Sequence, residues 1–426
     1  MANTQELNRM CLGLMAHVDA GKTTLAEAML YCAGALRSLG RVDHGDAFLD
    51  TFALERKRGI TIFSKQALLQ LEDLQITLLD TPGHVDFSAE MERTLSVLDC
   101  AVLVIGGSAG IQSHTLTLWR LLRQKNIPTV LFVSKMDLPG ADREAIYQEL
   151  RRSLGGGVID LSAPDPEELA LCDETLLDEL LDTGEISSAS IREAVARGTV
   201  FPVWFGAALK LEGVDEFLSG LKAYAPVCRE ETAFSARVFK ISRDAQGVRE
   251  THLKVLGGTL STRQTLEGQG WSEKITGLRV YSGAKFQAVE TAYPGDVVAA
   301  VGLTRTLPGM GLGMAALEQP ESPALSPVLT YQVLLPEGYD VTRALVCLRQ
   351  LEEEDPQLQV DFVEAKQEIR IRIMGPIQLE ILKELLLERF SLPVAFSQGS
   401  ILYRETIGNT VEGVGHYEPL RHYAEV

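Results

Sequence analysis

Residues that could bind a phosphate and activate water occur in two short stretches of this 426-residue chain. The first, "AHVDAGKTT" (residues 16–24), follows an apolar run and precedes a helix-like segment, which is the context that a phosphate-binding loop requires. The second, "LLDTPGHVDF" (78–87), ends an apolar run at Asp80 and continues through a turn to His84. Together they predict two loops that meet at one phosphate–metal pair.

In the first stretch, the backbone N–H groups of the loop and of the helix N-terminus would point at the phosphates. Lys22 would reach the outer phosphates, and the Thr23 hydroxyl would ligate Mg²⁺. Ala16 stands where the strict pattern has glycine, and it is small enough to keep the turn. The alternative is a strand–helix turn without a ligand. The predicted binding residues are His17, Val18, Asp19, Ala20, Gly21, Lys22, Thr23 and Thr24.

In the second stretch, Asp80 is expected to hold Mg²⁺ through its water shell. Gly83 permits its own amide to approach the terminal phosphate, because it has no side chain in the way. The spacing then puts His84 beside the γ-phosphate, where it could orient the attacking water. A lone histidine next to a turn is more often structural, so this assignment depends on the phosphate loop.

A third element, "SKMD" (134–137), follows the apolar run "TVLFV" and indicates which base is bound. Asp137 could accept hydrogen bonds from both N1–H and the 2-amino group of guanine, a donor pair that adenine lacks. Ser134 and Lys135 belong to the same predicted contact. The tripeptide alone is weak evidence, but its position after two phosphate elements predicts a site for GTP or GDP.

The elements that must position these loops alternate between strand and helix up to about residue 225, which predicts a doubly wound α/β fold with a mostly parallel sheet. The expected strands are Met10–Met15, Ile76–Leu79, Ala101–Ile105, Thr129–Val133 and Val200–Phe205. The expected helices are Thr24–Leu36, Ala89–Leu98, Thr115–Gln124 and Arg143–Leu154, and the acidic segment at 162–185 is expected to be a solvated helical insertion.

Four domains are predicted: residues 1–225 bind the nucleotide, 233–317 form a small β-barrel, 327–400 form a ferredoxin-like β-α-β-β-α unit, and 401–426 begin a fourth domain. The net charge of −18 argues against strong binding of free nucleic acid. Scattered cysteines, the absence of an evident secretory signal and the lack of long apolar runs predict a cytoplasmic monomer that does not contact the membrane.

These motifs together resemble those of translational GTPases, most closely elongation factor G and the tetracycline ribosomal-protection proteins. "AHVDAGKTT", "ERKRGITI", "DTPGHVDF", "SKMD" and "GAALK" match the five nucleotide-binding motifs in order, and "MGPIQLEIL" and "YRETI" resemble signatures of the third and fourth domains. The resemblance implies a ribosome-stimulated GTPase. It leans towards drug protection, with a translocase-type paralogue as the alternative. Only the first strand or two of the fourth domain could exist. The chain is therefore expected to be a fragment of a longer protein, or to have lost the extension that the family's fourth domain provides.

The resemblance also assigns roles to individual residues. It implies that Thr61 ligates Mg²⁺ in the GTP state, and that Val18 and Ile60 form a hydrophobic gate beside His84, the catalytic histidine that the ribosome orders. Asp19 would help to hold a monovalent cation. The "GAALK" motif adds Ala207, Ala208 and Leu209 to the guanine site.

Two positions depart from the family pattern: Ser134 replaces the usual asparagine, and Ala207 replaces the usual serine. We therefore expect weaker nucleotide binding, by an amount on the order of one or two hydrogen bonds. Two other classes of function remain open. One is a GTP-gated binding module that hydrolyses little, and the other is a small-molecule P-loop kinase that would prefer ATP.

Overall fold

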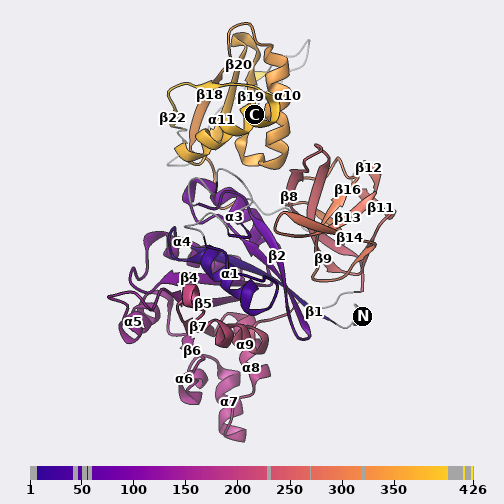
Figure 1. The fold of residues 1–426 in the computed structure, drawn as a ribbon. Helices are drawn as coiled ribbons and strands as arrows, with labels where there is room; N and C mark the ends of the chain where they lie inside the picture. Colours follow the sequence, from indigo (N-terminus) through magenta and orange to yellow (C-terminus); the bar gives the residue numbers. More distant parts are fainter. Residues whose placement is uncertain are drawn as a thin grey trace.

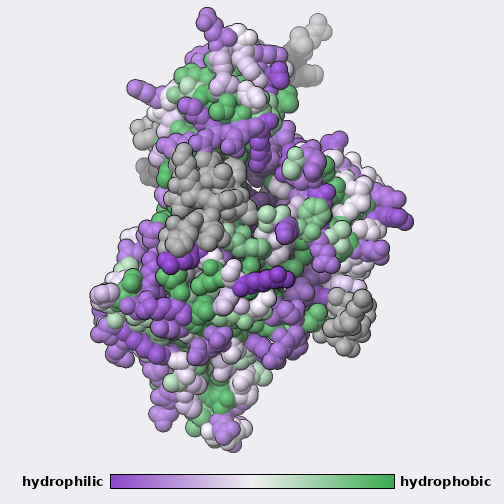
Figure 2. All heavy atoms as spheres, in the orientation of Figure 1, coloured by the Kyte–Doolittle hydropathy of each residue, from purple (hydrophilic) through white to green (hydrophobic). Residues whose placement is uncertain are grey.

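The structure is a computed structural model that describes residues 7–41, 47–49, 55, 60–227, 232–268, 270–317, 323–401, 416–417 and 424–425. Figure 1 shows three sheet-containing domains, with the α/β domain below, the second domain to the right and the third domain above. In the same orientation, hydrophilic side chains lie along the outer edges of all three (Figure 2). Within these ranges no helix is long and apolar enough to cross a membrane.

The first domain is built on a seven-stranded sheet in the order β2-β3-β1-β4-β5-β7-β6. All neighbouring strands are parallel except β2 and β3, which are antiparallel. The strands are β1 (Asn8–Ala16), β2 (Lys65–Leu71), β3 (Leu74–Asp80), β4 (Cys100–Gly106), β5 (Thr129–Ser134), β6 (Val158–Asp160) and β7 (Phe201–Phe205). The five strands expected from the sequence are present, whereas β2 and β6 were not expected.

Helices cover both faces of this sheet, so the doubly wound prediction is confirmed. One apolar core lies between the sheet and α1 (Lys22–Cys32), α8 (Ser188–Arg197) and α9 (Val214–Tyr224). The other lies between the sheet and α3 (Ser88–Leu95), α4 (Ser113–Gln124) and α5 (Arg143–Leu154). The acidic insertion contains two short helices, α6 (Pro166–Ala170) and α7 (Glu174–Thr183), at the lower end of the domain (Figure 1).

The second domain is an antiparallel sheet in the order β14-β13-β16-β9-β8-β17, with two small two-stranded sheets beside it. Its strands enclose an apolar core that includes Val238, Leu253, Leu278 and Val298. The large sheet contains β8 (Ser235–Arg243), β9 (Arg249–Gly257), β13 (Gly277–Ser282), β14 (Lys285–Val289), β16 (Val297–Val301) and β17 (Gly311–Gly313). The small sheets pair β10 (Leu260–Ser261) with β15 (Thr291–Ala292), and β11 (Thr265–Gly268) with β12 (Trp271–Lys274).

The third domain follows the expected β-α-β-β-α order and adds short strands at its end. Ile369, Ile371 and Ile373 alternate along one strand and are all buried under the helices. The elements are β18 (Leu329–Leu334), α10 (Val341–Glu354), β19 (Asp361–Val363), β20 (Glu368–Ile373), α11 (Pro376–Phe390), β21 (Ala395–Phe396) and β22 (Ser400–Ile401). Most of the expected fourth-domain start, including "YRETI", lies outside the described residues. Two short strands of this segment are described: β23 (His416–Tyr417) pairs with β24 (Ala424–Glu425).

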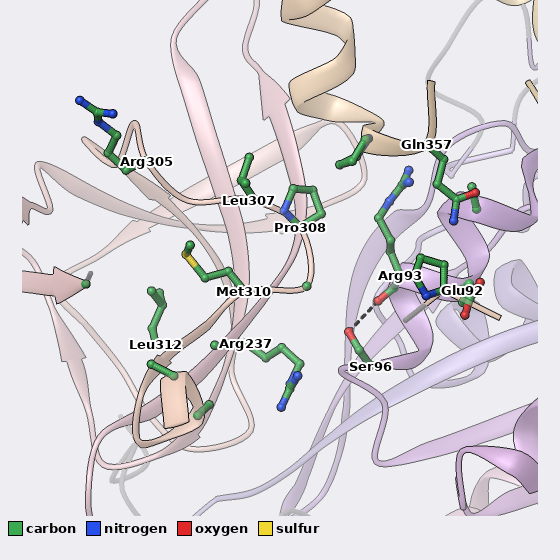
Figure 3. A pocket seen from close by; sticks show the side chains of 18 of the residues that line it. Glu92, Arg93, Ser96, Arg237, Arg305, Leu307, Pro308, Met310, Leu312 and Gln357 are labelled. Atoms are coloured by element: carbon green, nitrogen blue, oxygen red, sulfur yellow. Dashed lines mark hydrogen bonds between the residues drawn. The ribbon is translucent and has the colours of Figure 1, made fainter. Parts of the chain in front are cut away.

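Helix α3 lies where the three domains meet. A cleft of about 750 Å³ lies between one face of α3 and the second domain. Figure 3 shows Glu92 and Arg93 of α3, with Ser96 just after it, on one side of this cleft, and Leu307 and Met310 on the other. Because α3 begins four residues after His84, contacts made by this helix bear directly on the predicted site.

Candidate nucleotide-binding site

The loop between β1 and α1 has the backbone shape that a phosphate loop needs. Asp19 (φ 63°) and Gly21 (φ 96°) adopt left-handed conformations. A Cβ atom on Gly21 would lie 2.9 Å from Ser134 Oγ, so both the backbone angle and the available space favour glycine. The N-terminus of α1 has no side-chain cap and no acidic residue in its first turn. Its N–H groups are therefore available to an anion.

Three groups from three segments converge behind this loop. The Lys22 ammonium donates to the Asp80 carboxylate and, at 3.2 Å, to Thr61 Oγ1. Thr61 Oγ1 lies 3.5 Å from the other carboxylate oxygen of Asp80. Lys22 and Thr61 are each 7% exposed and Asp80 is 0% exposed. A buried charge pair of this kind is stable only while both partners remain.

The same cluster fits a magnesium ion in its donor chemistry. Carboxylate and hydroxyl oxygens are the hard ligands that Mg²⁺ prefers, and Mg²⁺ usually keeps several waters beside one or two carboxylates. Asp80 and Thr61 supply such oxygens. Thr23, one residue after Lys22, lines a cavity together with Thr61.

The loop after β3 brings Gly83 and His84 against the phosphate loop. A Cβ atom on Gly83 would lie only 3.1 Å from the Ala16 carbonyl oxygen, so a side chain there would push the two loops apart. His84 caps a short 3₁₀ helix, η2 (Val85–Phe87), and its Nδ1 accepts from the Asp86 N–H at 3.1 Å. Its side chain is 29% exposed. The imidazole is therefore at the rim of the site and not packed inside the sheet.

One cavity of about 190 Å³ joins these loops. It collects residues from the predicted phosphate loop, from the end of the "ERKRGITI" motif, and from the loop that carries His84. Its lining residues are His17, Val18, Asp19, Ala20, Gly21, Lys22, Thr23, Thr24, Ile60, Thr61, Gly83, His84 and Lys135. Asp80 does not line the cavity, but its carboxylate accepts from the ammonium of the lining residue Lys22.

The expected base-binding residues lie next to this cavity on two further loops. The Lys135 ammonium donates to the Asp19 carbonyl oxygen at 2.5 Å, which ties the base loop to the phosphate loop. The Asp137 carboxylate lies 3.0 Å from the Lys210 ammonium. The Met136 N–H donates to the Gly206 carbonyl oxygen at 3.1 Å, which joins the two loops. In the second loop Ala207 and Ala208 are buried, whereas Leu209 is half exposed.

The sequence pattern of the elongation factor Tu GTP binding domain matches residues 7–227, more than half of the chain. The chain belongs to this family. Tetracycline resistance protein TetP of Clostridium perfringens is 32% identical over 93% of this chain and 65% of its own length. The oxytetracycline resistance protein of Streptomyces rimosus is 34% identical over 92% of this chain and 65% of its own. The chain thus spans less than two thirds of both relatives.

A crystal structure of a protein from Thermus thermophilus shares 27% sequence identity, with a TM-score of 0.81. The alignment covers 98% of this chain and 72% of that one, so the likeness extends through all three described domains. The resemblance to translational GTPases that the motifs indicated is therefore confirmed.

Within this GTP binding domain, three neighbours of the site had no local signal in the sequence. Lys210 follows the "GAAL" residues but was not singled out as a partner of Asp137. The ring of His114, on α4, lies 6.1 Å from that of His17, whose Nδ1 is buried without a hydrogen-bond partner. Burial, together with His17 and His84, lowers the pKa of His114. Asp86 is the third: its carboxylate lies 3.3 Å from His84 Nδ1 and also accepts from the Ile377 N–H of the third domain.

Proposed function

We propose that this protein binds GTP with Mg²⁺ and hydrolyses it when it meets the ribosome. The observation that carries the proposal is the convergence of Lys22, Thr61 and Asp80 beside a cavity that also contains His84. A phosphate-binding ammonium, metal-binding oxygens and an imidazole at the rim are the groups that phosphoryl transfer to water requires. Family membership supports GTP as the nucleotide.

In this proposal each residue has a distinct task. Lys22 and the α1 N-terminus hold the phosphates, and the Gly83 N–H approaches the terminal one. Asp137 selects guanine once the base displaces Lys210. Mg²⁺, when bound, neutralises the developing charge on the phosphates.

His84 would orient the attacking water through Nε2, because its Nδ1 already faces the N–H and the carboxylate of Asp86. Val18 and Ile60 flank the approach as a hydrophobic gate, and Asp19 contributes to a monovalent-cation site. The imidazole lies at the rim of the site with its side chain 29% exposed. This position supports a catalytic group that becomes ordered only when a partner binds.

We further propose that the whole protein acts on ribosomes as a tetracycline-protection factor. The support is the 30% to 34% identity to tetracycline resistance proteins. A translocase role is the alternative within the same family. A GTP-gated module with little hydrolysis is the alternative from another class, and the Ser134 and Ala207 departures favour it mildly.

The test is single-turnover cleavage of GTP with and without ribosomes, for the wild type and for His84→Ala. We expect ribosomes to accelerate the wild type, and the substitution to lower the accelerated rate by about 10²-fold or more while GDP affinity stays within a few-fold. Absence of stimulation in the wild type would exclude the ribosome-stimulated GTPase. Loss of GDP binding in His84→Ala would make His84 structural. Release of labelled tetracycline from ribosomes would then separate protection from translocation.

A further inference from the structure

The orientation of His84 depends on its neighbour Asp86. The Asp86 backbone N–H donates to His84 Nδ1 at 3.1 Å, across a single turn of 3₁₀ helix. Asp86 Oδ1 lies 3.3 Å from the same Nδ1, so this nitrogen faces both the backbone N–H and the carboxylate of Asp86. Anything that moves Asp86 therefore changes the groups that set the tautomer of His84 and the orientation of its ring.

The side chain of Asp86 is held by a different domain. One carboxylate oxygen accepts from the Ile377 N–H at 2.7 Å, in the first turn of α11, which is 291 residues away in sequence. Helix α11 has no side-chain cap of its own, and Pro376 at its start has no N–H to donate. A carboxylate at this end is favoured both by the hydrogen bond and by the helix dipole. Asp86 thus caps a helix of the third domain from the first.

Gly375 makes room for this cap. A Cβ atom at position 375 would lie 2.2 Å from the Asp86 carboxylate carbon and from one of its oxygens. The backbone of Gly375 is extended (φ −165°), a conformation that any residue adopts. The need for glycine here is therefore close approach by Asp86 and not an unusual backbone angle.

The docking around this contact is well packed. Ile62 and Phe87 of the first domain form a buried cluster with Ile381 and Leu385 of α11. Asp86 itself is 8% exposed. Its carboxylate is therefore shielded from water, where a charge-assisted hydrogen bond is stronger than at a surface.

We propose that Asp86 is a positioning residue that makes the orientation of His84 depend on the docking of the third domain. While α11 is seated, the Asp86 carboxylate is fixed and the adjacent peptide N–H holds His84 Nδ1. If α11 moves away, the carboxylate loses the Ile377 N–H, η2 is released, and His84 loses the fixed placement of the two Asp86 groups that face its Nδ1. The effect on hydrolysis rests on the proposed function, whereas the effect on the imidazole does not.

The experiment uses four variants of the full chain: Asp86→Ala, Asp86→Asn, Gly375→Ala, and the double variant Asp86→Ala with Gly375→Ala. The first measurement is the ¹⁵N spectrum of labelled histidine without ribosomes, with the His84 signals assigned by their loss in His84→Gln. The second is GTP cleavage with ribosomes, separated into kcat and KM. Thermal unfolding and GDP affinity check that each variant folds and binds.

We expect the wild-type His84 to show one tautomer, because Asp86 fixes both groups that face Nδ1. Asp86→Ala and Gly375→Ala should each give mixed tautomers and lower kcat by about 10²-fold, the loss typical of slight misplacement of a catalytic group, with KM unchanged. Asp86→Asn keeps an oxygen acceptor for the Ile377 N–H and should restore most of both signals. Since the alanine at 86 removes the atoms with which a Cβ at 375 would clash, the double variant should be no worse than Asp86→Ala.

The matched control is Asp355→Asn. The Asp355 carboxylate accepts from Arg93 Nη1 at 2.7 Å, so it joins the same two domains without touching Asp86 or His84. It should leave the His84 tautomer unchanged. Additive effects of the two alanine substitutions, unchanged His84 signals in Asp86→Ala, or an equal change in Asp355→Asn would each overturn the proposal. If ribosomes do not stimulate the wild type, the proposed function fails, and the ¹⁵N spectra still decide the coupling.

Discussion

Lys22 provides the sharpest test of the site, because it has a partner both with and without nucleotide. In the structure its ammonium is the charge partner of Asp80, which is 0% exposed. Within the described part of the chain, the other side-chain contact of that carboxylate is to Thr61 Oγ1, and it is long at 3.5 Å. Lys22→Ala removes the charge partner of the buried Asp80. We therefore expect the free energy of unfolding of the first domain to fall by about 3–5 kcal/mol in the absence of nucleotide.

The same substitution removes the phosphate contacts. Hydrogen bonds to charged groups contribute about 1.5–3 kcal/mol each, so the loss of two gives about 3–6 kcal/mol. This corresponds to a Kd for GDP that is weaker by about 10²- to 10⁴-fold. The assays are titration of a fluorescent GDP and urea unfolding of the nucleotide-free protein.

A double variant separates the two effects. Lys22→Ala with Asp80→Ala removes the uncompensated charge, so it should recover much of the lost stability while nucleotide binding stays weak. Unchanged GDP affinity in Lys22→Ala would refute the phosphate-loop assignment. Unchanged stability in Lys22→Ala would show that Asp80 does not depend on the ammonium.

Individual contacts give three further predictions. Asp137→Ala should weaken GDP binding by about 10²-fold or more and erase the preference for GTP over ATP in competition titrations, because two hydrogen bonds to guanine are lost. Ser134→Asn should tighten GDP binding by up to about tenfold in the same assay, because Ser134 Oγ lies beside the space left by Gly21 and an amide there could brace the loop. Burial, and next Lys240, lowers the pKa of His252 from 6.5 to about 3 against the opposing effect of Glu90. As the pH falls below 6.5, the unfolded chain binds a proton that the folded chain takes up only near pH 3. The free energy of unfolding should therefore decrease by up to about 5 kcal/mol as the pH falls from 6.5 to 3. Urea unfolding from about pH 7 to about pH 4 should show a smaller loss in His252→Gln, and an equal loss would contradict this cause.

The sequence predicted best the elements whose residues are buried on both faces. β1, β4 and β5 each contain a continuous apolar run, so their positions followed from composition alone. β2 was missed because it lies at the edge of the sheet and its sequence, "KQALLQL", mixes polar and apolar residues without strict alternation. β6 has three residues, too few to give a periodic signal.

The site residues divide in the same way, into those that belong to a short sequence motif and those whose role depends on a contact with a distant part of the sequence. The phosphate-loop residues and His84 were predicted because each belongs to a short motif with its own chemistry, and the structure brings them into one cavity. The contact between Asp86 and Ile377 could not be predicted, because no local pattern pairs residues 291 positions apart. The motif that contains Gly375 was recognised, but its physical reason is visible only in the folded chain.

Helix α3 shows why such distant contacts matter for a nucleotide switch. Although burial would raise the pKa of Glu90, Lys240 of the second domain and Arg93 hold it well below its usual range. Arg93 in turn reaches Asp355 of the third domain. Buried pairs of this kind contribute little net stability, since desolvation offsets their attraction, but breaking one partner away costs several kcal/mol. The helix that follows His84 is thus held in one arrangement by both other domains, and these charges disfavour intermediate positions. A change at the phosphates that shifts α3 would have to break these contacts together, which favours two discrete domain arrangements over a gradual one.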